Sequence, residues 1–276
     1  ILKRSSYFTI DMNCNIVVEL CTGLVDHGFI RTFRLSEKTN LFKGTVNKGT
    51  IKGGIMKIID ITGPIYEGMW DYGGEIKPFR LGKVKMEYAG VEYELDSLEN
   101  MIAFTGTYFE TPGDVHGYTA NDVPLEKLYG IDSYVLQMPC EDLKIVDNRP
   151  CVFADDMEKA EKGKIPEGSG IIMSTGYGKN WENKDYLQKC PFLNKDAMDY
   201  LIDKKPLIVA FDTPSAENDV HPENAFERYF NANILTVTAC INLEKIKNYN
   251  VKLTVMPLKI LKVSLGCPAR AIVIED

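Results

Sequence analysis

The residues with the clearest potential for chemistry lie between Met101 and Asp114, a stretch that reads M-I-A-F-T-G-T-Y-F-E-T-P-G-D. Its centre, residues 105–107, has the Thr-Gly-Thr composition of a tight turn between apolar flanks. Phe104, Tyr108 and Glu110 are spaced i, i+4 and i+6 around that turn. This spacing would gather metal ligands if the three residues were two histidines and an aspartate. Here two of them are aromatic, and only Glu110 offers a carboxylate.

The densest cluster of ionisable side chains after the same turn consists of Glu110, Asp114 and His116. Two carboxylates and an imidazole can bind one divalent ion, because oxygen and nitrogen ligands suit several metals. A solvated loop without any ligand explains the same three residues. We keep them as metal candidates, while expecting no bound cofactor.

Aromatic residues near this stretch have two interpretations. Trp70, Tyr72, Tyr108 and Phe109 can line a pocket for a flat ligand, or they can belong to the core. The Gly-Tyr-Gly at 176–178 is too short for a dinucleotide-binding fingerprint and is typical of a tight turn. The sequence contains no P-loop, nucleophile elbow or H-E-x-x-H motif.

The elements that must position these residues alternate between strands and helices. Strands are expected at 57–62, 80–86, 91–95, 133–138, 170–174, 207–211, 234–238, 251–255, 259–263 and 271–274, and helices at 125–129, 155–162, 194–204, 225–231 and 243–246. Residues 88–90 join the second and third strands as a turn, and Asn194 caps the third helix. Strands alternating with helices, with consecutive strands at both ends, predict an α/β domain with a mixed β-sheet.

Composition and charge limit the classes of function. A net charge of −7 disfavours nucleic acid and anionic membranes as partners, and no apolar run is long enough to span a membrane. The seven cysteines form no C-x-x-C pair, which is typical of reduced thiols in the cytoplasm. We therefore expect a cytoplasmic protein that binds neither nucleic acid nor membrane.

The first 55 residues differ in charge from the rest of the chain. They carry 8 Lys and Arg against 4 Asp and Glu, a net +4, which leaves −11 for residues 56–276. Residues 52–56, K-G-G-I-M, can be encoded as a ribosome-binding sequence just upstream of a start codon. One hypothesis is that 1–55 is a translated leader and that native translation starts at Met56. The other is a genuine N-terminal extension, and the intact mass of the native protein separates the two.

From Met56 onward, the order of motifs resembles the cyclase family, which includes bacterial kynurenine formamidase and isatin hydrolase. The motifs that carry the resemblance are I-D-I-T-G-P-I at 59–65 with G-M at 68–69, A-F-T-G-T-Y-F-E-T-P at 103–112, S-T-G-Y at 174–177, D-T-P-S at 212–215, N-L at 242–243, and P-L-K at 257–259 with G-C-P-A-R-A at 266–271. The resemblance covers essentially all of residues 56–276. It implies a swivelling β/β/α cyclase-type domain.

The departures from the family pattern fall on its chemistry. Family members bind a catalytic metal through the two histidines and the aspartate of the signature, where this chain has Phe104, Tyr108 and Glu110. The histidine of the family's opening strand corresponds to Gly63, and the later histidine and glutamate correspond to Phe226 and Thr238. In the family the metal polarises an amide carbonyl and activates water. Only Glu110 keeps the type of donor that this chemistry needs.

Two functions follow from the resemblance. The first is a hydrolase of a small formamide, cyclic amide or lactone, with Glu110 as base and Tyr108 as donor, or with zinc or manganese if the family activity is retained. The second is a non-catalytic, metal-free relative that binds a small aromatic ligand or a protein in the old cleft. The expected ligand pocket consists of Trp70, Phe104, Thr107, Phe226 and Thr238. Family members associate, so a homodimer or homotetramer is expected.

Overall fold

The computed structural model describes residues 6–9, 17–25, 28–35 and 56–275, and the chain forms two compact units, Ile1–Gly54 and Ile55–Asp276. In the first unit, β1 (Ser6–Thr9), β2 (Val17–Val25) and β3 (Gly28–Leu35) form an antiparallel sheet in that order. Whether this unit is a leader or an extension stays a prediction. No helix within the described ranges is long and apolar enough to cross a membrane.

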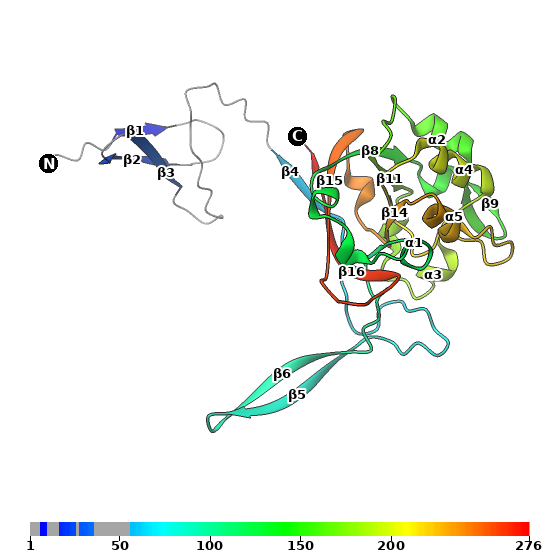
Figure 1. The fold of residues 1–276 in the computed structure, drawn as a ribbon, viewed down its shortest axis with the longest axis horizontal. Coiled ribbons are helices and arrows are strands. Elements are labelled where there is room, and N and C mark those ends of the chain that lie inside the picture. The colour runs from blue at the N-terminus through cyan, green and yellow to red at the C-terminus, as the bar shows by residue number, and fades with distance from the viewer. Residues whose placement is uncertain (1–5, 10–16, 26–27, 36–55, 276) are drawn as a thin grey trace. The chain divides into compact units, whose positions relative to one another are not determined.

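A closed, mixed sheet forms the centre of the second unit (Figure 1). Its order is β15 (Asn250–Pro257), β8 (Ile131–Gln137), β11 (Gly170–Ser174), β13 (Ile208–Phe211), β14 (Leu235–Thr238), β7 (Tyr108–Glu110), β16 (Gly266–Glu275) and β4 (Lys57–Asp60). The strands from β8 to β14 are parallel, and the others pair antiparallel. A further pairing of β15 with β16 closes the sheet into a barrel. This architecture confirms the expected α/β fold of the swivelling β/β/α type with a mixed sheet.

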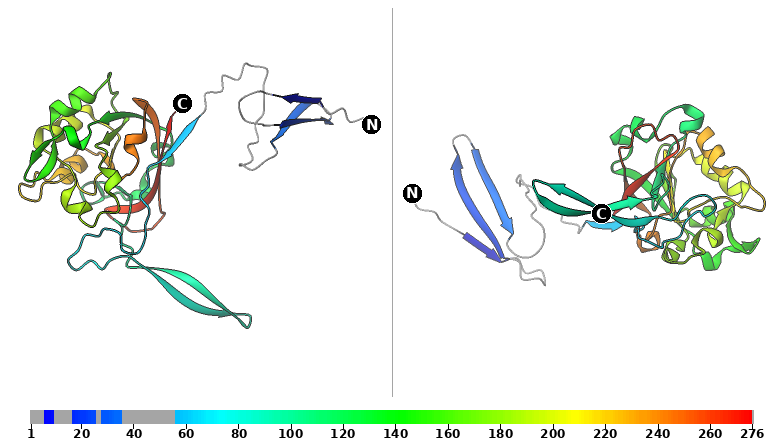
Figure 2. Two further views of the ribbon diagram at one scale, coloured as in Figure 1. Left: turned by 180° about the vertical axis from the view of Figure 1, so that it is seen from behind. Right: turned by 90° about the horizontal axis from the view of Figure 1, so that it is seen from below.

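The longer helices cover one side of the barrel, opposite β15 and β16 (Figures 1 and 2). They are α2 (Ala154–Ala160), α4 (Lys195–Lys204) and α5 (Ala225–Asn231). The shorter elements are α1 (Gly113–His116), α3 (Tyr186–Lys189), β9 (Lys144–Val146), β10 (Arg149–Val152), β12 (Phe192–Leu193) and 3₁₀ turns at Ala120–Asp122, Leu125–Lys127, Cys140–Asp142, Tyr177–Asn180 and Leu243–Lys245. The helix expected at 125–129 is therefore a 3₁₀ turn.

Successive side chains of the barrel strands belong alternately to two separate hydrophobic cores. On β11, Ile172 packs inside the barrel, whereas Ile171 and Met173 pack under the helices. Both faces of the strand are buried, because successive side chains point to opposite sides. A continuous apolar strand such as 170–174 is the sequence pattern that this arrangement requires.

Helix α4 forms where its cap and its apolar stripe predict. The Asn194 side chain accepts a hydrogen bond from the Ala197 amide at 3.1 Å, and Ala197, Met198 and Leu201 are buried. The strand expected at 259–263 is wrong, since this segment is a loop between β15 and β16. Strand β15 already pairs on both sides with β8 and β16, and Lys262 has a φ of 66°, which a strand does not accommodate.

A β-hairpin projects from the second unit (Figures 1 and 2). It consists of β5 (Arg80–Tyr88) and β6 (Val91–Glu99), which pair only with each other. Ala89 and Gly90 have φ angles of 51° and 76°. Two successive positive φ values are the geometry of a two-residue turn that matches the strand twist. The turn expected at 88–90 is confirmed.

Candidate functional site

Strands β7 and β14 bring the central residues of the site together. Thr236 lies opposite Glu110, and Thr238 lies opposite Tyr108. Phe109, between the two β7 residues, belongs to the core inside the barrel. Because side chains alternate along a strand, Tyr108 and Glu110 lie on the outer side of the barrel wall.

The carboxyl group of Glu110 is buried, and both of its hydrogen bonds to protein groups are made by one oxygen. Its Oε2 accepts hydrogen bonds from the hydroxyls of Thr236 at 2.8 Å and Thr238 at 3.0 Å. Burial raises the pKa of Glu110 to about 7, and this effect outweighs the two hydrogen bonds, which lower the pKa. Within the described residues no donor approaches Oε1, so that oxygen remains available to a ligand. A carboxyl group with this pKa exchanges a proton readily near neutral pH.

A cleft of about 460 Å³ opens beside Glu110, which is room for a small molecule. Its walls come from the loops before β7 and after β13 and from β7, β10, α3 and α5. The lining residues are Tyr72, Phe104, Tyr108, Glu110, Arg149, Leu187, Gln188, Pro214, Ser215, Asp219 and Phe226.

Tyr108 has no free hydroxyl to offer a substrate. Its hydroxyl donates to the Pro214 carbonyl at 3.0 Å and accepts from the Tyr72 hydroxyl at 2.9 Å. Burial raises the pKa of Tyr108 well above its usual value, and the neighbouring Tyr72 and Glu110 act in the same direction. The Phe104 ring packs 5.0 Å from the Tyr108 ring. Tyr108 therefore orders the aromatic wall of the cleft, and the expected donor role does not agree with its hydrogen bonds.

Arg149 contributes a positive charge to the cleft. Its Nε donates to the Cys190 carbonyl at 2.8 Å, and its Nη2 donates to the Glu217 carbonyl at 3.1 Å. Its Nη1 meets Asp219 at 3.2 Å, but the Asp219 side chain is 78% exposed while that of Arg149 is 9% exposed. A ligand oxygen can replace Asp219 as the partner of Arg149 at little cost in free energy, because Asp219 is so exposed. Arg149 is not among the site residues expected from the sequence, where its one signal is a charged residue at the start of a short apolar segment.

A second buried carboxyl group, Asp212, ties together two loops at the carboxyl ends of the parallel strands. It accepts hydrogen bonds from the Thr175 amide at 2.9 Å and the Thr175 hydroxyl at 2.7 Å. Burial raises the pKa of Asp212 to about 7. Asp212 is not among the residues that line the cleft. Its contacts hold the loop that presents Pro214 and Ser215 to the cleft.

Two of the five residues expected in the ligand pocket, Phe104 and Phe226, line the cleft. Thr238 lies behind Glu110, to which its hydroxyl donates a hydrogen bond. Thr107 and Trp70 do not line the cleft either. The Thr107 hydroxyl donates to the Ala239 carbonyl at 2.6 Å and accepts from the Gly63 amide at 2.8 Å. Thr107 thus joins three chain segments and leaves no group for a ligand.

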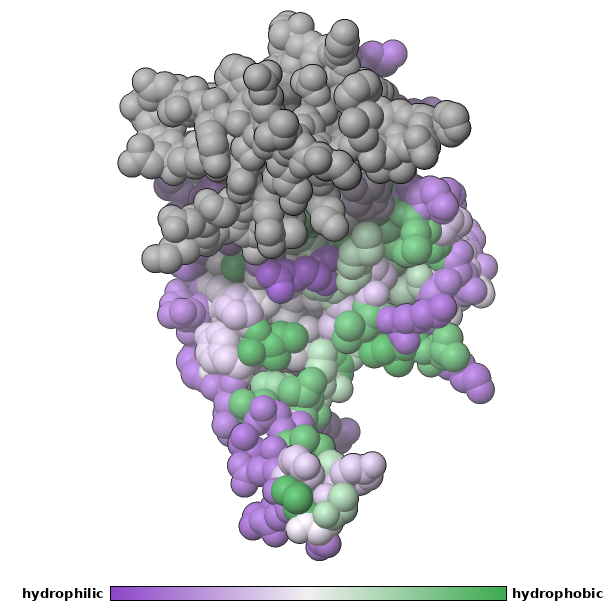
Figure 3. Space-filling model, turned by 90° about the vertical axis from the view of Figure 1, so that its left-hand side faces the viewer, coloured by the Kyte–Doolittle hydropathy of each residue, from purple (hydrophilic) through white to green (hydrophobic). Residues whose placement is uncertain are grey.

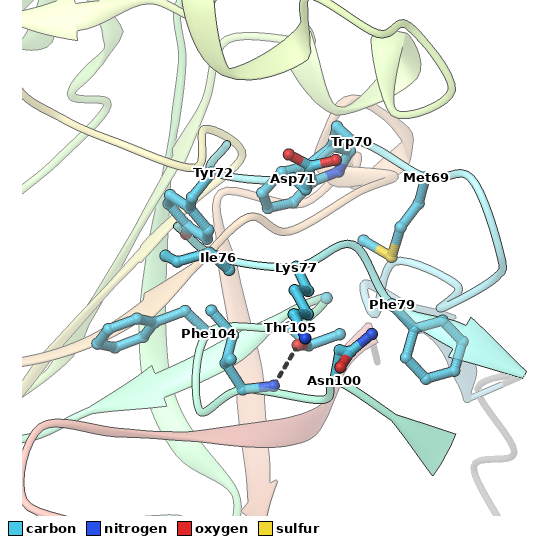
Figure 4. A pocket seen from close by; sticks show the side chains of 12 residues that line it. Met69, Trp70, Asp71, Tyr72, Ile76, Lys77, Phe79, Asn100, Phe104 and Thr105 are labelled. Carbon is cyan, nitrogen blue, oxygen red and sulfur yellow. Dashed lines mark hydrogen bonds between the residues drawn. The ribbon is translucent and has the colours of Figure 1, made fainter. Parts of the chain in front are cut away.

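Trp70 lies in an aromatic cluster beside the cleft. Its ring centroid is 5.3 Å from that of Trp181 and 5.2 Å from that of Tyr186. It also borders a second pocket, which shares Tyr72 and Phe104 with the cleft (Figure 4). That pocket has a volume of about 20 Å³, room for about one water molecule. Trp70 is therefore not among the residues that line the cleft.

Two of the three metal candidates, Glu110 and His116, are hydrogen-bonded to separate protein groups. On α1, Nε2 of His116 lies 2.9 Å from the Phe230 carbonyl. The side chain of Asp114 lies outside the described residues. Within the part of the chain that the structure describes, no group of three His, Cys, Asp or Glu side chains is arranged to hold a metal ion.

The space for the missing ligands is also filled. A Cβ atom on Gly63 would lie 2.3 Å from the Trp181 ring, so no histidine fits at position 63 without movement. A Cβ on Gly266 would lie 2.5 Å from the Phe104 ring. Phenylalanine has no lone pair for a metal, and the Thr238 hydroxyl is engaged by Glu110. The residues present do not fit a catalytic divalent metal.

The closed mixed barrel, its helical cover and the cleft beside β7 define an α/β protein whose cleft is large enough for a small molecule. More specifically, the chain belongs to the cyclase family, because residues 59–218, more than half of it, match the family described as "Putative cyclase". No curated protein matches the chain.

Solved structures share this fold. One titled "potential metal-dependent hydrolase with cyclase activity" has 23% identity and a TM-score of 0.59, covering 80% of this chain and 98% of its own. A "predicted metal-dependent hydrolase" from Bacillus stearothermophilus has 23% identity and a TM-score of 0.62, covering 81% and 100%. Isatin hydrolase A from Ralstonia solanacearum has 16% identity and a TM-score of 0.67, covering 80% and 92%. At these identities the likeness shows the fold alone.

Proposed function

We propose that the chain binds a small molecule in the cleft and hydrolyses its amide, cyclic amide or lactone bond, with Glu110 transferring the proton. The observation that carries the proposal is a buried carboxyl group with a pKa of about 7 at the wall of a cleft of about 460 Å³. Strongly perturbed pKa values in clefts are typical of catalytic groups. Membership of the cyclase family supports the reaction type.

The residues of the cleft supply the steps that such a reaction needs. The ionised form of Glu110 takes a proton from water as the water oxygen attacks the carbonyl carbon. The carbonyl oxygen becomes an oxyanion, for which Arg149 is the one basic group among the residues that line the cleft. Protonated Glu110 then returns the proton to the departing nitrogen or oxygen. Phe104 and Phe226 hold the apolar part of the substrate.

A second candidate, a binding protein without catalysis, is favoured by one specific observation. The Tyr108 hydroxyl is committed to Pro214 and Tyr72, so Tyr108 is not the free donor that the hydrolytic mechanism expected of it. The cleft has room for a ligand whether or not a reaction follows binding. In this case the ligand would be a small aromatic molecule that is released unchanged.

One set of measurements on the full chain separates the two candidates. We would assay N-formylkynurenine, isatin and simple cyclic amides and lactones, for the chain itself and for Glu110→Gln. The exposed Glu141→Gln, on a 3₁₀ turn away from the cleft lining, is the matched control. Hydrolysis predicts a kcat that rises with pH through about 7, as Glu110 loses its proton, and a loss of at least about 100-fold in Glu110→Gln.

Binding of these compounds without turnover in every variant would favour the second candidate. Turnover that requires stoichiometric zinc or manganese would contradict both metal-free proposals. Activity retained in Glu110→Gln would remove Glu110 from the mechanism.

A further inference from the structure

A second cleft opens beside the amino-terminal ends of the parallel strands β13 and β14, where Leu207 and Leu235 line it. Leu235 belongs to the core inside the barrel, whereas the next residue, Thr236, donates its hydrogen bond to Glu110 on the outer side. The second cleft and the Glu110 cleft have no lining residue in common. A ligand in the second cleft would therefore leave the Glu110 cleft free.

The second cleft is a hollow in the surface, which distinguishes it from the exposed apolar residues elsewhere. On the face shown in Figure 3, hydrophobic residues lie on the hairpin, the lower projection in that view, and on the body above it. Exposed apolar residues of this kind do not by themselves define a ligand. The second cleft has a volume of about 210 Å³. Sites for drug-sized molecules usually have about 300–1,000 Å³, so the ligand that fits here is smaller.

Part of the lining of the second cleft is apolar. Val123 and Leu235 are buried residues of the core inside the barrel, and Leu207 packs against that core. A small apolar group can replace water over these three side chains, which favours binding.

Two opposite charges also line the second cleft, and they do not form an ion pair with each other. Asp122 and Lys127 come from two successive 3₁₀ turns. The Oδ2 of Asp122 accepts hydrogen bonds from the amide of Thr119 at 2.8 Å and from its hydroxyl at 2.9 Å. These bonds lower the pKa of Asp122 and keep it ionised near neutral pH. In the part of the chain that the structure describes, neither the Oδ1 of Asp122 nor the ammonium group of Lys127 has a partner.

Asn233 and Tyr118 add neutral polar groups to the second cleft. The Tyr118 hydroxyl donates to the Oδ1 of Asn233 at 2.7 Å. This bond leaves the Asn233 Nδ2 group as a donor and the Tyr118 hydroxyl oxygen as an acceptor. The second cleft therefore offers a cation and an amide donor for an anionic group, together with a carboxylate and a hydroxyl acceptor for a cationic group.

We propose that the second cleft binds a free α-amino acid with an apolar side chain. Lys127 and the Asn233 amide bind its carboxylate, Asp122 binds its ammonium group, and its side chain covers Val123 and Leu235. A ligand with a single charge leaves one of the two protein charges without a partner, whereas a zwitterion satisfies both. Hydrogen bonds between charged groups are the strong class, and they allow a small ligand to bind specifically.

The test is isothermal titration calorimetry of the full chain with L-leucine, L-valine and L-methionine. At least one of them is expected to bind with a stoichiometry of one. Isocaproate has the leucine skeleton without the amino group, and isoamylamine has it without the carboxylate. Each is expected to bind at least about 10-fold more weakly than leucine, because each loses one charged contact. Absence of binding by all three amino acids would overturn the proposal, and isocaproate that binds as tightly as leucine would overturn it in favour of a simple anion site.

Two variants locate the bound amino acid. Lys127→Gln and Asp122→Asn each remove one charge and are expected to weaken binding at least about 10-fold. Glu126→Gln, on the same 3₁₀ turn as Lys127 but outside the cleft lining, is the matched control and binds like the wild type. Asp122 also caps its turn, so circular dichroism checks that Asp122→Asn is folded, while Lys127→Gln removes no contact within the described chain. Binding that is unchanged in Lys127→Gln would overturn the proposal.

The variant Glu110→Gln separates this site from the proposed reaction. It is expected to bind the amino acid as tightly as the wild type, because Glu110 does not line the second cleft. Loss of amino-acid binding in Glu110→Gln would place the ligand in the Glu110 cleft and overturn the proposal, whatever the outcome of the hydrolysis assays.

Discussion

At the scale of single residues, Glu110 is the group whose environment departs most from what its position in the sequence suggests. The sequence places it after a turn, where a carboxylate is ordinarily solvated. In the fold it is 7% exposed, with both nearby hydroxyls on one oxygen. Burial raises the pKa of Glu110 to about 7, from its ordinary value of 4.5. The consequence can be measured in stability as well as in catalysis.

The free energy of unfolding should fall as the pH rises from about 4.5 to about 7. Across this range the unfolded chain has released the Glu110 proton while the folded chain still holds it, so deprotonation favours unfolding. A shift of this size corresponds to about 3 kcal/mol, since one pKa unit is worth 1.36 kcal/mol. Urea unfolding at pH 4.5, 6 and 8 measures it. Glu110→Gln should lose less stability over this range than wild type, by about 2–3 kcal/mol.

The surface variant Glu141→Gln is the control for that comparison and should follow the wild-type curve. An identical pH dependence in wild type and Glu110→Gln would show that the pKa of Glu110 is not raised in the folded protein.

Metal removal should leave the protein's stability unchanged. Phe104 and Phe226 line the cleft at positions where a metal site would need ligand atoms. No metal-binding group forms among the described residues. A ligand at 100 times its Kd stabilises a protein by about 2.7 kcal/mol, which corresponds to several degrees in Tm. Calorimetry after treatment with a chelator, and again after adding zinc or manganese, should show Tm changes below about 1 °C. A rise of several degrees with either metal would contradict this expectation.

At the scale of elements, the site depends on close packing between the segment after β4 and the 3₁₀ turn at Tyr177–Asn180. Trp181 follows that turn, and its Nε1 donates to the Pro64 carbonyl at 2.9 Å. Its ring lies where a side chain of residue 63 would be. The same contact stabilises the loop and excludes a ligand histidine.

Replacing Gly63 by alanine should destabilise the protein by about 1–3 kcal/mol, the usual cost of overpacking a filled core. The added Cβ would lie 2.3 Å from a rigid ring, so the ring or the backbone must move. Gly163→Ala is the matched control, because its Cβ would meet only the edge of Tyr249, at 3.9 Å. Chemical denaturation of both variants measures the difference, and equal stabilities would show that Trp181 moves aside freely.

At the scale of the whole molecule, the chain consists of two compact units that divide after Gly54. The second unit contains the closed barrel, both cores and the cleft. A barrel closed by its own strands needs nothing from outside to satisfy its hydrogen bonds. The hairpin of β5 and β6 is one part of this unit whose apolar side chains remain exposed.

A chain that begins at Met56 should therefore keep the thermal transition of the full-length protein to within about 2 °C. Calorimetry of both chains tests this expectation, with circular dichroism as the measure of folding. A loss of the transition in the shorter chain would mean that residues 1–55 are needed for the barrel to fold.

Most elements of the second unit were predictable from the sequence, because their signals are local. The apolar run at 170–174, the Asn194 cap and the turn at 88–90 each depend on neighbours in the chain, and each lies where expected. The expected strand at 259–263 failed for a tertiary reason. Its β-branched residues fit a strand, but the edges of β15 were already occupied.

The sequence by itself determined the fold, the family and the absence of histidines at the ligand positions, since these depend on residue type and order. Only the tertiary structure decided which side chains share the cleft. Arg149 and Phe226 share the cleft with Glu110 although they come from elements far along the chain, whereas Thr107, three residues from Glu110, faces the backbone instead. Burial of Glu110 is likewise a property of the assembled barrel wall. The pKa that makes Glu110 a candidate acid–base group arises from that burial, which no local pattern of residues encodes.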